Sequence, residues 1–508
     1  MFMKKNRKAD FTKYICVIIT FMALLAVTLL CFSNGISGND FWWHIKVGEW
    51  VVEHKAVPNV DIFSWCGMEK EISWTAHEWL ADVIFYYLYS IGGSIGIFLF
   101  CLVSAITMSV LMFREAKKNI EKNFLISGLF FVLFAVIASL FFYGRPHVFS
   151  YFLLFFELKF LYEFMDDFNS KKIFLIPIIA IFWSNLHGGS ASLSYILCFL
   201  FLFSGIFNIS YGRVENKRFD ANSKFRLVMV TLGAVLGVLV NPIGIRVLAY
   251  PYINLSDNIS MSVISEWLPP DAKIIGNVIL YFLPILLMTL GIICGRTKIR
   301  LVDILVMLAF LFLFFRSARF IVLWYISAIF YAFRYLPEVK IKAITKKSEK
   351  IAVFSLIVLL CIPCVMGIND TTKTYKNGTL ITETMSKTAI EIIRKDSPKR
   401  IYNDYNLGEA LIYNDIPVFF DARADLYAQE GIMADGISLM YLEPVGQTNQ
   451  CGYIDVEAMI EKYHFDAILI LKGRSLYSYI MNHPEKFKLI YEDDSLGYFR
   501  ISEREGSK

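Results

Sequence analysis

The residues best suited to chemistry follow the first apolar segment of the chain. The run Asp40-Phe41-Trp42-Trp43-His44 places an acid, two tryptophans and a histidine at the mouth of a predicted membrane helix. Tryptophan favours the boundary between water and lipid, so anchoring explains Trp42 and Trp43. It does not explain Asp40 or His44, because an ionisable side chain at that depth is costly and usually faces a cavity or a partner. A carboxylate such as Asp40 can accept the proton of an attacking hydroxyl group as a general base.

Further polar residues lie beside other apolar segments. Arginines hold phosphate oxygens with charge-assisted hydrogen bonds, and a group of His, Asp and Glu can bind a divalent metal such as Mg or Mn. Such a set suits the transfer of a group from a lipid phosphate to an acceptor hydroxyl or amine. We expect phosphate contacts from Arg145, Arg316, Arg319 and His187, an acceptor pocket with Trp43, His44, His77, Glu78, Asn185 and Glu266, and metal contacts, if any, from Asp40, His77 and Glu78.

Each of these clusters also has a simpler explanation. The arginines can extend to lipid headgroups, and His77-Glu78 can favour the start of a helix through the helix dipole. His187, which two glycines follow, can end a helix. Metal binding has the least support, because the chain has no HExxH or cysteine pattern typical of a metal site.

The elements that must position these residues are membrane helices. The chain has 508 residues, of which 56% are hydrophobic and only 19% charged, and its mean hydropathy is +0.52. Apolar runs of about 20 residues recur, which is the length needed to cross a bilayer. The net charge of +5 does not indicate nucleic-acid binding, because the basic residues lie in short loops between apolar runs. We therefore expect a polytopic α-helical membrane protein.

The basic loops predict the orientation. Lys and Arg collect at the N-terminus and in 114–122, 171–172, 213–226, 296–300 and 334–350, so these parts are predicted to be cytoplasmic. The N-terminus is then inside, and the clusters described above all fall on the outer side. A shared outer cavity explains that one-sided distribution. About eleven spans are expected, near 14–32, 80–112, 124–143, 148–165, 172–184, 190–210, 227–240, 274–294, 301–315, 320–334 and 350–368.

The tail after the last span has a different character. We divide the chain into a transmembrane domain, 1–368, with a first outer loop at 33–79, and an extracytoplasmic domain, 369–508. Short apolar runs alternate with helix-like stretches in the tail, which predicts a small α/β domain. The expected strands are 400–402, 417–420, 467–471, 488–491 and 498–501, and the expected helices are 406–413, 456–463 and 476–482.

The first outer loop resembles that of a known family. An acid just after span one, then Trp42-Trp43-His44, the run Pro58–Ser64 and the run Trp74–Leu80 are similar to the GT-C superfamily of membrane glycosyltransferases. The likeness is greatest to a bacterial branch related to protein O-mannosyltransferases and aminoarabinose transferases, and it covers roughly residues 14–330. It implies a polyprenyl-phosphate-linked sugar as donor and places Asp40 at the essential acid of the first outer loop.

Two departures from that family stand out. Many members follow the first acid directly with a second acid, whereas Phe41 follows Asp40 here. Where relatives have a Lys-Pro-Pro-Leu-like stretch before span two, this chain has Ala76-His77-Glu78-Trp79-Leu80.

The sequence therefore predicts a hexosyl or pentosyl transferase of the bacterial cell envelope, multi-pass in the plasma membrane. It would move a sugar, with inversion, from a polyprenyl-phosphate donor to a glycan, lipid or protein acceptor at the outer face, with Asp40 as general base. Three alternatives remain open: a polysaccharide ligase or polymerase with a lipid-diphosphate donor, a transporter, and a non-enzymatic envelope scaffold. For the scaffold, the run Asp421–Tyr427 is either a polar patch or a salt-bridged loop.

Overall fold

The chain folds into two compact units. The computed structural model describes residues 40–74, 76–120, 124–250, 267–335, 385–428, 430–445 and 454–502. Within these residues, the first unit draws on Leu88–Pro251 and Glu266–Ile381, and the second on Gly38–Tyr87 and Thr382–Lys508. The predicted first outer loop thus packs with the C-terminal part of the chain.

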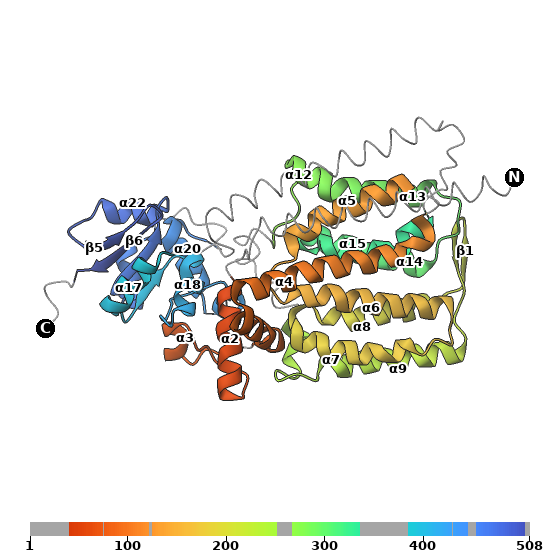
Figure 1. The fold of residues 1–508 in the computed structure, drawn as a ribbon, viewed down its shortest axis with the longest axis horizontal. Coiled ribbons are helices and arrows are strands. Elements are labelled where there is room, and N and C mark those ends of the chain that lie inside the picture. Colours follow the sequence, from red (N-terminus) through yellow and green to blue (C-terminus); the bar gives the residue numbers. More distant parts are fainter. Residues whose placement is uncertain are drawn as a thin grey trace. The chain divides into compact units, whose positions relative to one another are not determined.

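The first unit is a bundle of apolar helices (Figure 1). Every predicted span within the described residues coincides with helical structure, while the spans near 14–32 and 350–368 lie outside them. Three described helical stretches, Trp79–Ala116, Ala221–Val238 and Ile275–Cys294, are long and apolar enough to cross a membrane. The helices are α4 (Trp79–Ile120), α5 (Phe124–Phe141), α6 (His147–Asp166), α7 (Ile176–Leu186), α8 (Ser192–Ser204), α9 (Ala221–Val238), α12 (Ile275–Asn277), α13 (Leu283–Cys294), α14 (Leu301–Arg316) and α15 (Ile321–Tyr335).

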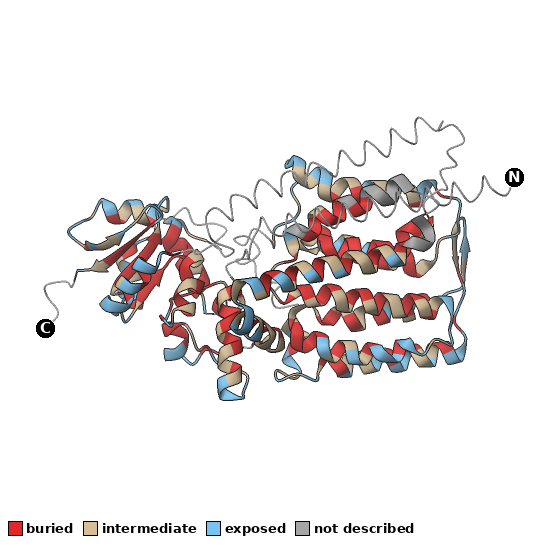
Figure 2. Cartoon of the chain, viewed as in Figure 1, coloured by how far each residue is buried: buried red, intermediate tan, exposed pale blue. Residues whose placement is uncertain are grey.

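Two features organise this bundle. Helix α15 is buried along nearly its whole length and packs against α5, α6, α13 and α14, so it forms the centre of the core (Figure 2). Helices α7 and α9 approach closely at Gly237, where an added Cβ would lie 2.6 Å from the backbone oxygen of Pro177. A residue without a side chain is therefore needed at this crossing.

At one end of the bundle, a basic side chain from a loop predicted to be cytoplasmic hydrogen-bonds to a neighbouring helix. A hairpin of β1 (Ile209–Tyr211) and β2 (Val214–Asn216) carries Arg213 in its turn. The Arg213 guanidinium donates to the carbonyl oxygens of Ile292 and Ile293, both at 2.7 Å, and so satisfies the last turn of α13.

The second unit begins with helices where a loop was predicted. Helix α2 (Phe41–His54) and the short α3 (Trp65–Glu69) occupy the first outer segment, and the start of α4 follows them. The buried apolar positions Trp43, Val47 and Val51 recur every four residues, which explains why α2 forms.

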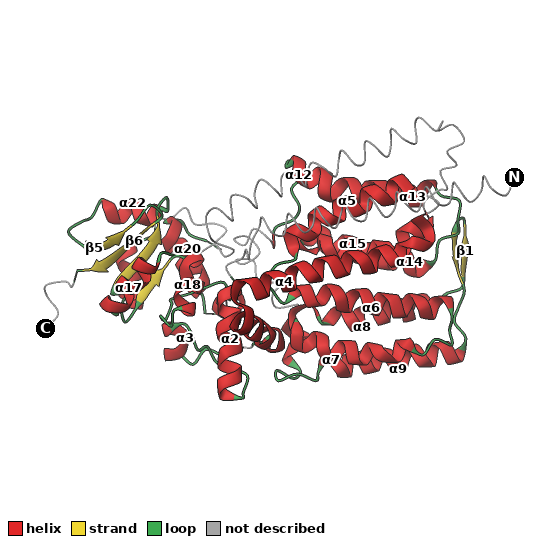
Figure 3. Cartoon of the chain, in the orientation of Figure 1, coloured by secondary structure: helices red, strands yellow, loops and turns green. Residues whose placement is uncertain are grey.

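The C-terminal part of the second unit is a four-stranded sheet with helices around it (Figure 3). The strand order is β3-β4-β6-β5, with β3 parallel to β4 and the other pairs antiparallel. The strands are β3 (Ile401–Asn403), β4 (Ala467–Leu471), β5 (Phe487–Glu492) and β6 (Leu496–Ile501), and the helices are α17 (Lys387–Asp396), α18 (Gly408–Tyr413), α19 (Ala424–Ala428), α20 (Ile432–Tyr441), α21 (Val456–Tyr463) and α22 (Ser475–Met481).

Most of the elements predicted in the tail are present. The exception is 417–420, where the prediction of a strand of the sheet is wrong. Val418 instead makes an isolated bridge with Ser64 of the first outer segment. Its apolar neighbours Phe419 and Phe420 are buried, because this stretch lies between the sheet and the residues around α3.

Candidate functional site

Asp40 lies at the N-terminal boundary of α2, where its backbone oxygen accepts a hydrogen bond from the backbone N–H of His44 at 3.3 Å. Helix α2 is held by α18 of the C-terminal part. The rings of Trp42 and Tyr413 lie 4.3 Å apart, and Nζ of Lys46 lies 2.7 Å from Oδ1 of Asp415. The predicted base is therefore carried on a helix fixed from outside its own segment.

Helix α18 brings a second acid into the electrostatic field of Asp40. Glu409 is 1% exposed, and its Oε1 accepts a hydrogen bond from the backbone N–H of Ala422 at 3.1 Å. Burial raises the pKa of the Glu409 carboxyl well above its usual range, and the negative charges of Asp40 and Asp421 raise it further. Sequence reasoning missed Glu409, because nothing in the run 406–413 distinguishes it from an ordinary helical glutamate.

Four residues predicted for the acceptor pocket meet beside α2. Trp43 and His44 are buried on that helix, with their rings 3.7 Å apart. Nε2 of His44 lies 3.9 Å from Oε2 of Glu78, and Nε2 of His77 lies 3.6 Å from Oε1 of Glu78. The side chains of His77 and Glu78 are 13% and 12% exposed, so solvent can reach both of them.

The predicted metal contacts are Asp40, His77 and Glu78. In the part of the chain that the structure describes, no group of three or more His, Cys, Asp or Glu side chains is arranged to hold a metal ion. Metal binding by these three residues stays a prediction, and the chemistry below uses only side chains.

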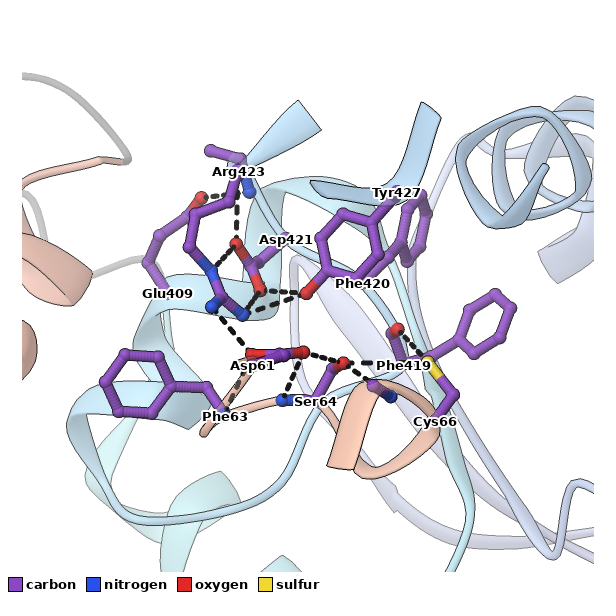
Figure 4. A network of polar contacts seen from close by, with 12 residues as sticks. Asp61, Phe63, Ser64, Cys66, Glu409, Phe419, Phe420, Asp421, Arg423 and Tyr427 are labelled. Carbon is purple, nitrogen blue, oxygen red and sulfur yellow. Dashed lines mark hydrogen bonds and ion pairs between the residues drawn. The ribbon is translucent and has the colours of Figure 1, made fainter. Parts of the chain in front are cut away.

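A buried ionic network joins the first outer segment to the C-terminal part (Figure 4). Nη1 of Arg423 lies 2.7 Å from Oδ1 of Asp61, and its Nη2 lies 2.6 Å from Oδ2 of Asp421. The Tyr427 hydroxyl donates to Asp421 at 2.5 Å, and the guanidinium stands 4.7 Å from the ring centre of Trp74. The predicted salt bridge is present between Asp421 and Arg423 in the loop, and α19 begins directly after it at Ala424.

The bundle contains a separate polar pocket, within the first unit. The empty space at this pocket is about 420 Å³, including the open solvent at its entrance. Nδ1 of His187 lies 2.6 Å from Oγ of Ser150 and 2.7 Å from Oγ of Ser190, and the indole N–H of Trp183 donates to both hydroxyls. The described residues that line the pocket are Phe141, Tyr143, His147, Ser150, Tyr151, His187, Ser190, Arg319, Phe320 and Leu323.

This lining favours an anion. Arg319 supplies a fixed positive charge, His187 and the two serines supply polar groups, and none of the described lining residues is acidic. The guanidinium of Arg319 also lies 5.6 Å from the ring centre of Trp267. Sequence reasoning found Arg319 and His187 but missed Ser150 and Ser190, because isolated serines in apolar helices give no signal.

The other predicted phosphate and pocket residues lie elsewhere. Arg145 contacts the Tyr143 ring, 4.9 Å from its centre, and Arg316 ends α14; neither is among the lining residues. The Asn185 amide donates to the carbonyl oxygens of Ile181 and Val240, so it joins α7 to the residues after α9. Glu266 lies outside the described residues.

The fold is similar to solved structures of archaeal oligosaccharyltransferases. One is AglB from Archaeoglobus fulgidus in complex with an inhibitory peptide and a dolichol-phosphate, with a TM-score of 0.59 and 12% identity over 91% of this chain and 70% of that chain. Another is an Archaeoglobus fulgidus oligosaccharyltransferase in the apo form, with a TM-score of 0.50 and 13% identity over 90% of this chain and 70% of that chain.

These likenesses, at 12% and 13% identity, show the fold alone. The chain has a GT-C-like fold with a small sheet domain, and three of its described helical stretches are long and apolar enough to cross a membrane. No protein-family model matches its sequence, and no curated protein matches it.

Proposed function

We propose that the chain is a membrane glycosyltransferase that moves a sugar from a polyprenyl-phosphate donor to an acceptor hydroxyl or amine. The observation that carries this proposal is the pocket with Arg319 and His187, which lacks acidic residues in its described lining and lies in a bundle with a GT-C-like fold. A similar protein, AglB, has been solved with a dolichol-phosphate, which supports a lipid phosphate as the anion.

The pocket is assigned to the donor phosphate. The Arg319 guanidinium pairs with phosphate oxygens and stabilises the charge that develops when the sugar leaves. The contacts between Nδ1 of His187 and the hydroxyls of Ser150 and Ser190 hold the ring in place, so this side chain meets the phosphate with little reorganisation. Arg145 and Arg316 stay predicted phosphate contacts that act from outside this lining.

Asp40 is assigned the role of general base. The acceptor oxygen or nitrogen attacks the anomeric carbon, the bond from that carbon to the phosphate oxygen breaks, and its electron pair leaves with the phosphate. The acceptor proton goes to the Asp40 carboxylate. Attack from the side opposite the leaving group inverts the anomeric configuration.

The proposal includes an orientation. The second unit and the pocket-bearing loops face the outside of the plasma membrane of a bacterial envelope, and the basic loops face the cytoplasm. Cysteines introduced at exposed Tyr211 and exposed Lys488 would be labelled from opposite sides by a membrane-impermeant maleimide.

The activity is tested with purified chain in nanodiscs and radiolabelled undecaprenyl-phosphate hexose or pentose. Wild type should release undecaprenyl phosphate, and Asp40→Asn should abolish transfer while it still binds undecaprenyl phosphate. Full transfer by a folded Asp40→Asn variant would contradict the assignment of the base. Turnover of an undecaprenyl-diphosphate sugar alone would favour the ligase alternative.

A further inference from the structure

A buried histidine–aspartate pair lies where α2 crosses the start of α4. Nδ1 of His44 lies 2.6 Å from Oδ1 of Asp82, and the two residues are 2% and 0% exposed. The crossing is close: a Cβ on Gly48 would lie 2.2 Å from the backbone oxygen of Asp82. The two backbones therefore approach more closely than a side chain at position 48 would allow, and this close approach brings His44 and Asp82 together.

The pair sets which nitrogen of His44 is available. Because Nδ1 is hydrogen-bonded to the Asp82 carboxyl group, Nε2 points the other way, toward Glu78 at 3.9 Å. The His44 ring also packs against two aromatic rings, with its centre 3.7 Å from that of Trp43 and 6.2 Å from that of Phe85. A carboxylate that orients a histidine in this way is a common support for a functional group.

Asp82 lies in the first turn of α4, where the helix dipole favours an acid, yet its complete burial there is costly. Its Oδ2 is buried, and among the described residues it has no hydrogen-bond partner. A buried carboxyl costs free energy that an amide or an apolar side chain would not. A role in positioning the His44 ring explains why a buried carboxyl group is present here despite that cost.

We propose that Asp82 is a positioning residue that, through a His44 ring with N–H groups on both nitrogens, holds the carboxylate of Glu78 as a binding group for the acceptor hydroxyl or amine. The chain of contacts runs from buried Asp82 through His44 to Glu78, which is 12% exposed and is flanked by His77 at 3.6 Å. No covalent bond changes in this step. The proposal rests on the proposed function, and it names the side of that reaction that binds the acceptor.

The first test uses nitrogen NMR of full chain with labelled histidine, in which His44→Gln identifies the His44 signals among seven histidines. Wild type should show a protonated, hydrogen-bonded Nδ1 on His44. Asp82→Asn should change that signature, and Glu78→Gln should shift Nε2. The matched control is Glu157→Gln, which exchanges another fully buried acid and should leave His44 unchanged. Wild-type His44 signals in both Asp82→Asn and Glu78→Gln would overturn the proposal.

The second test separates acceptor binding from donor use. Undecaprenyl-phosphate sugar is turned over with octyl glucoside or ethanolamine as acceptor probe, and with water alone. Asp82→Asn should raise the half-saturating probe concentration about 10- to 100-fold, with transfer to water unchanged, and Asp82→Glu should restore part of the loss. An equal loss in both reactions would overturn the positioning role. No turnover by wild type would instead remove the proposed function, and the NMR result alone would then decide whether the pair orients Glu78.

Discussion

Replacing Arg423 by methionine should loosen the second unit at a defined place. The Arg423 side chain is 1% exposed, and both carboxylates that it contacts, those of Asp61 and Asp421, are fully buried. Methionine fills similar space but leaves two buried negative charges without a counter-charge. Breaking a buried ion pair from one side costs about 3–5 kcal/mol. This cost falls on the contact between the first outer segment and the C-terminal part of the same unit.

Cys66 reports on that opening. Its thiol is buried and donates to the backbone oxygen of Phe419 at 3.1 Å, and Ser64 links it to Asp61. Burial raises the pKa of the Cys66 thiol to about 12, so the closed state reacts slowly with maleimide. If labelling requires opening, a loss of about 3–5 kcal/mol speeds it by roughly two to three and a half orders of magnitude.

The assay is peptide mapping of maleimide-labelled full chain by mass spectrometry, with exposed Cys294 as internal reference. A triple variant, Arg423→Met with Asp61→Asn and Asp421→Asn, removes the stranded charges and should recover most of the protection. A wild-type rate at Cys66 in Arg423→Met would refute the reasoning. Equal acceleration at Cys294 would point to general unfolding rather than opening at this network.

Other consequences follow from the same contacts. Arg319→Gln should weaken binding of undecaprenyl phosphate by about 1.5–3 kcal/mol in a titration, whereas Gln at exposed Arg246 should not; equal affinities would remove Arg319 from the phosphate site. Glu409→Gln should raise the free energy of unfolding near neutral pH but not below about pH 4, because a raised folded-state pKa makes ionisation cost stability as pH rises past the unfolded value. A pH-independent difference would contradict that. Gly237→Ala should lower the melting temperature, since its Cβ meets backbone, while Gly276→Ala, with open space around it, should not.

The helices of the bundle could be predicted from sequence because length and hydropathy are local properties. A run such as 148–165 needs no partner to be recognised, and α6 (His147–Asp166) matches it closely. The same holds in the tail for 456–463 and 467–471, which are α21 and β4. Local pattern also explains the error at 417–420, because buried apolar residues between two layers look like a strand of a sheet.

The candidate site was only partly predictable, because its contacts join distant segments. Arg423 and Asp61 are 362 positions apart, and neither segment indicates the other. In the bundle, Ser150 and Ser190 acquire a role only because α6 and the turn after α7 bring them both to His187. Residue type identified charged members such as Arg319, whereas the fold revealed the buried acids Glu409 and Asp82 as well as the neutral partners of each cluster.

Folding brings a second acid near Asp40, which the residues beside it in the sequence do not provide. No second acid follows it directly, yet α18 packs on α2 and brings buried Glu409 close enough for the charge of Asp40 to affect its pKa. On another part of α2, His44 is fixed by Asp82 of α4. Small misplacements of a reacting group cost large factors in rate, so a base carried on a helix braced by two other segments is better placed than one on a free loop. The packing of the C-terminal part on α2 is therefore a requirement of the proposed chemistry at Asp40, and loosening α18 should lower transfer even when donor binding is unchanged.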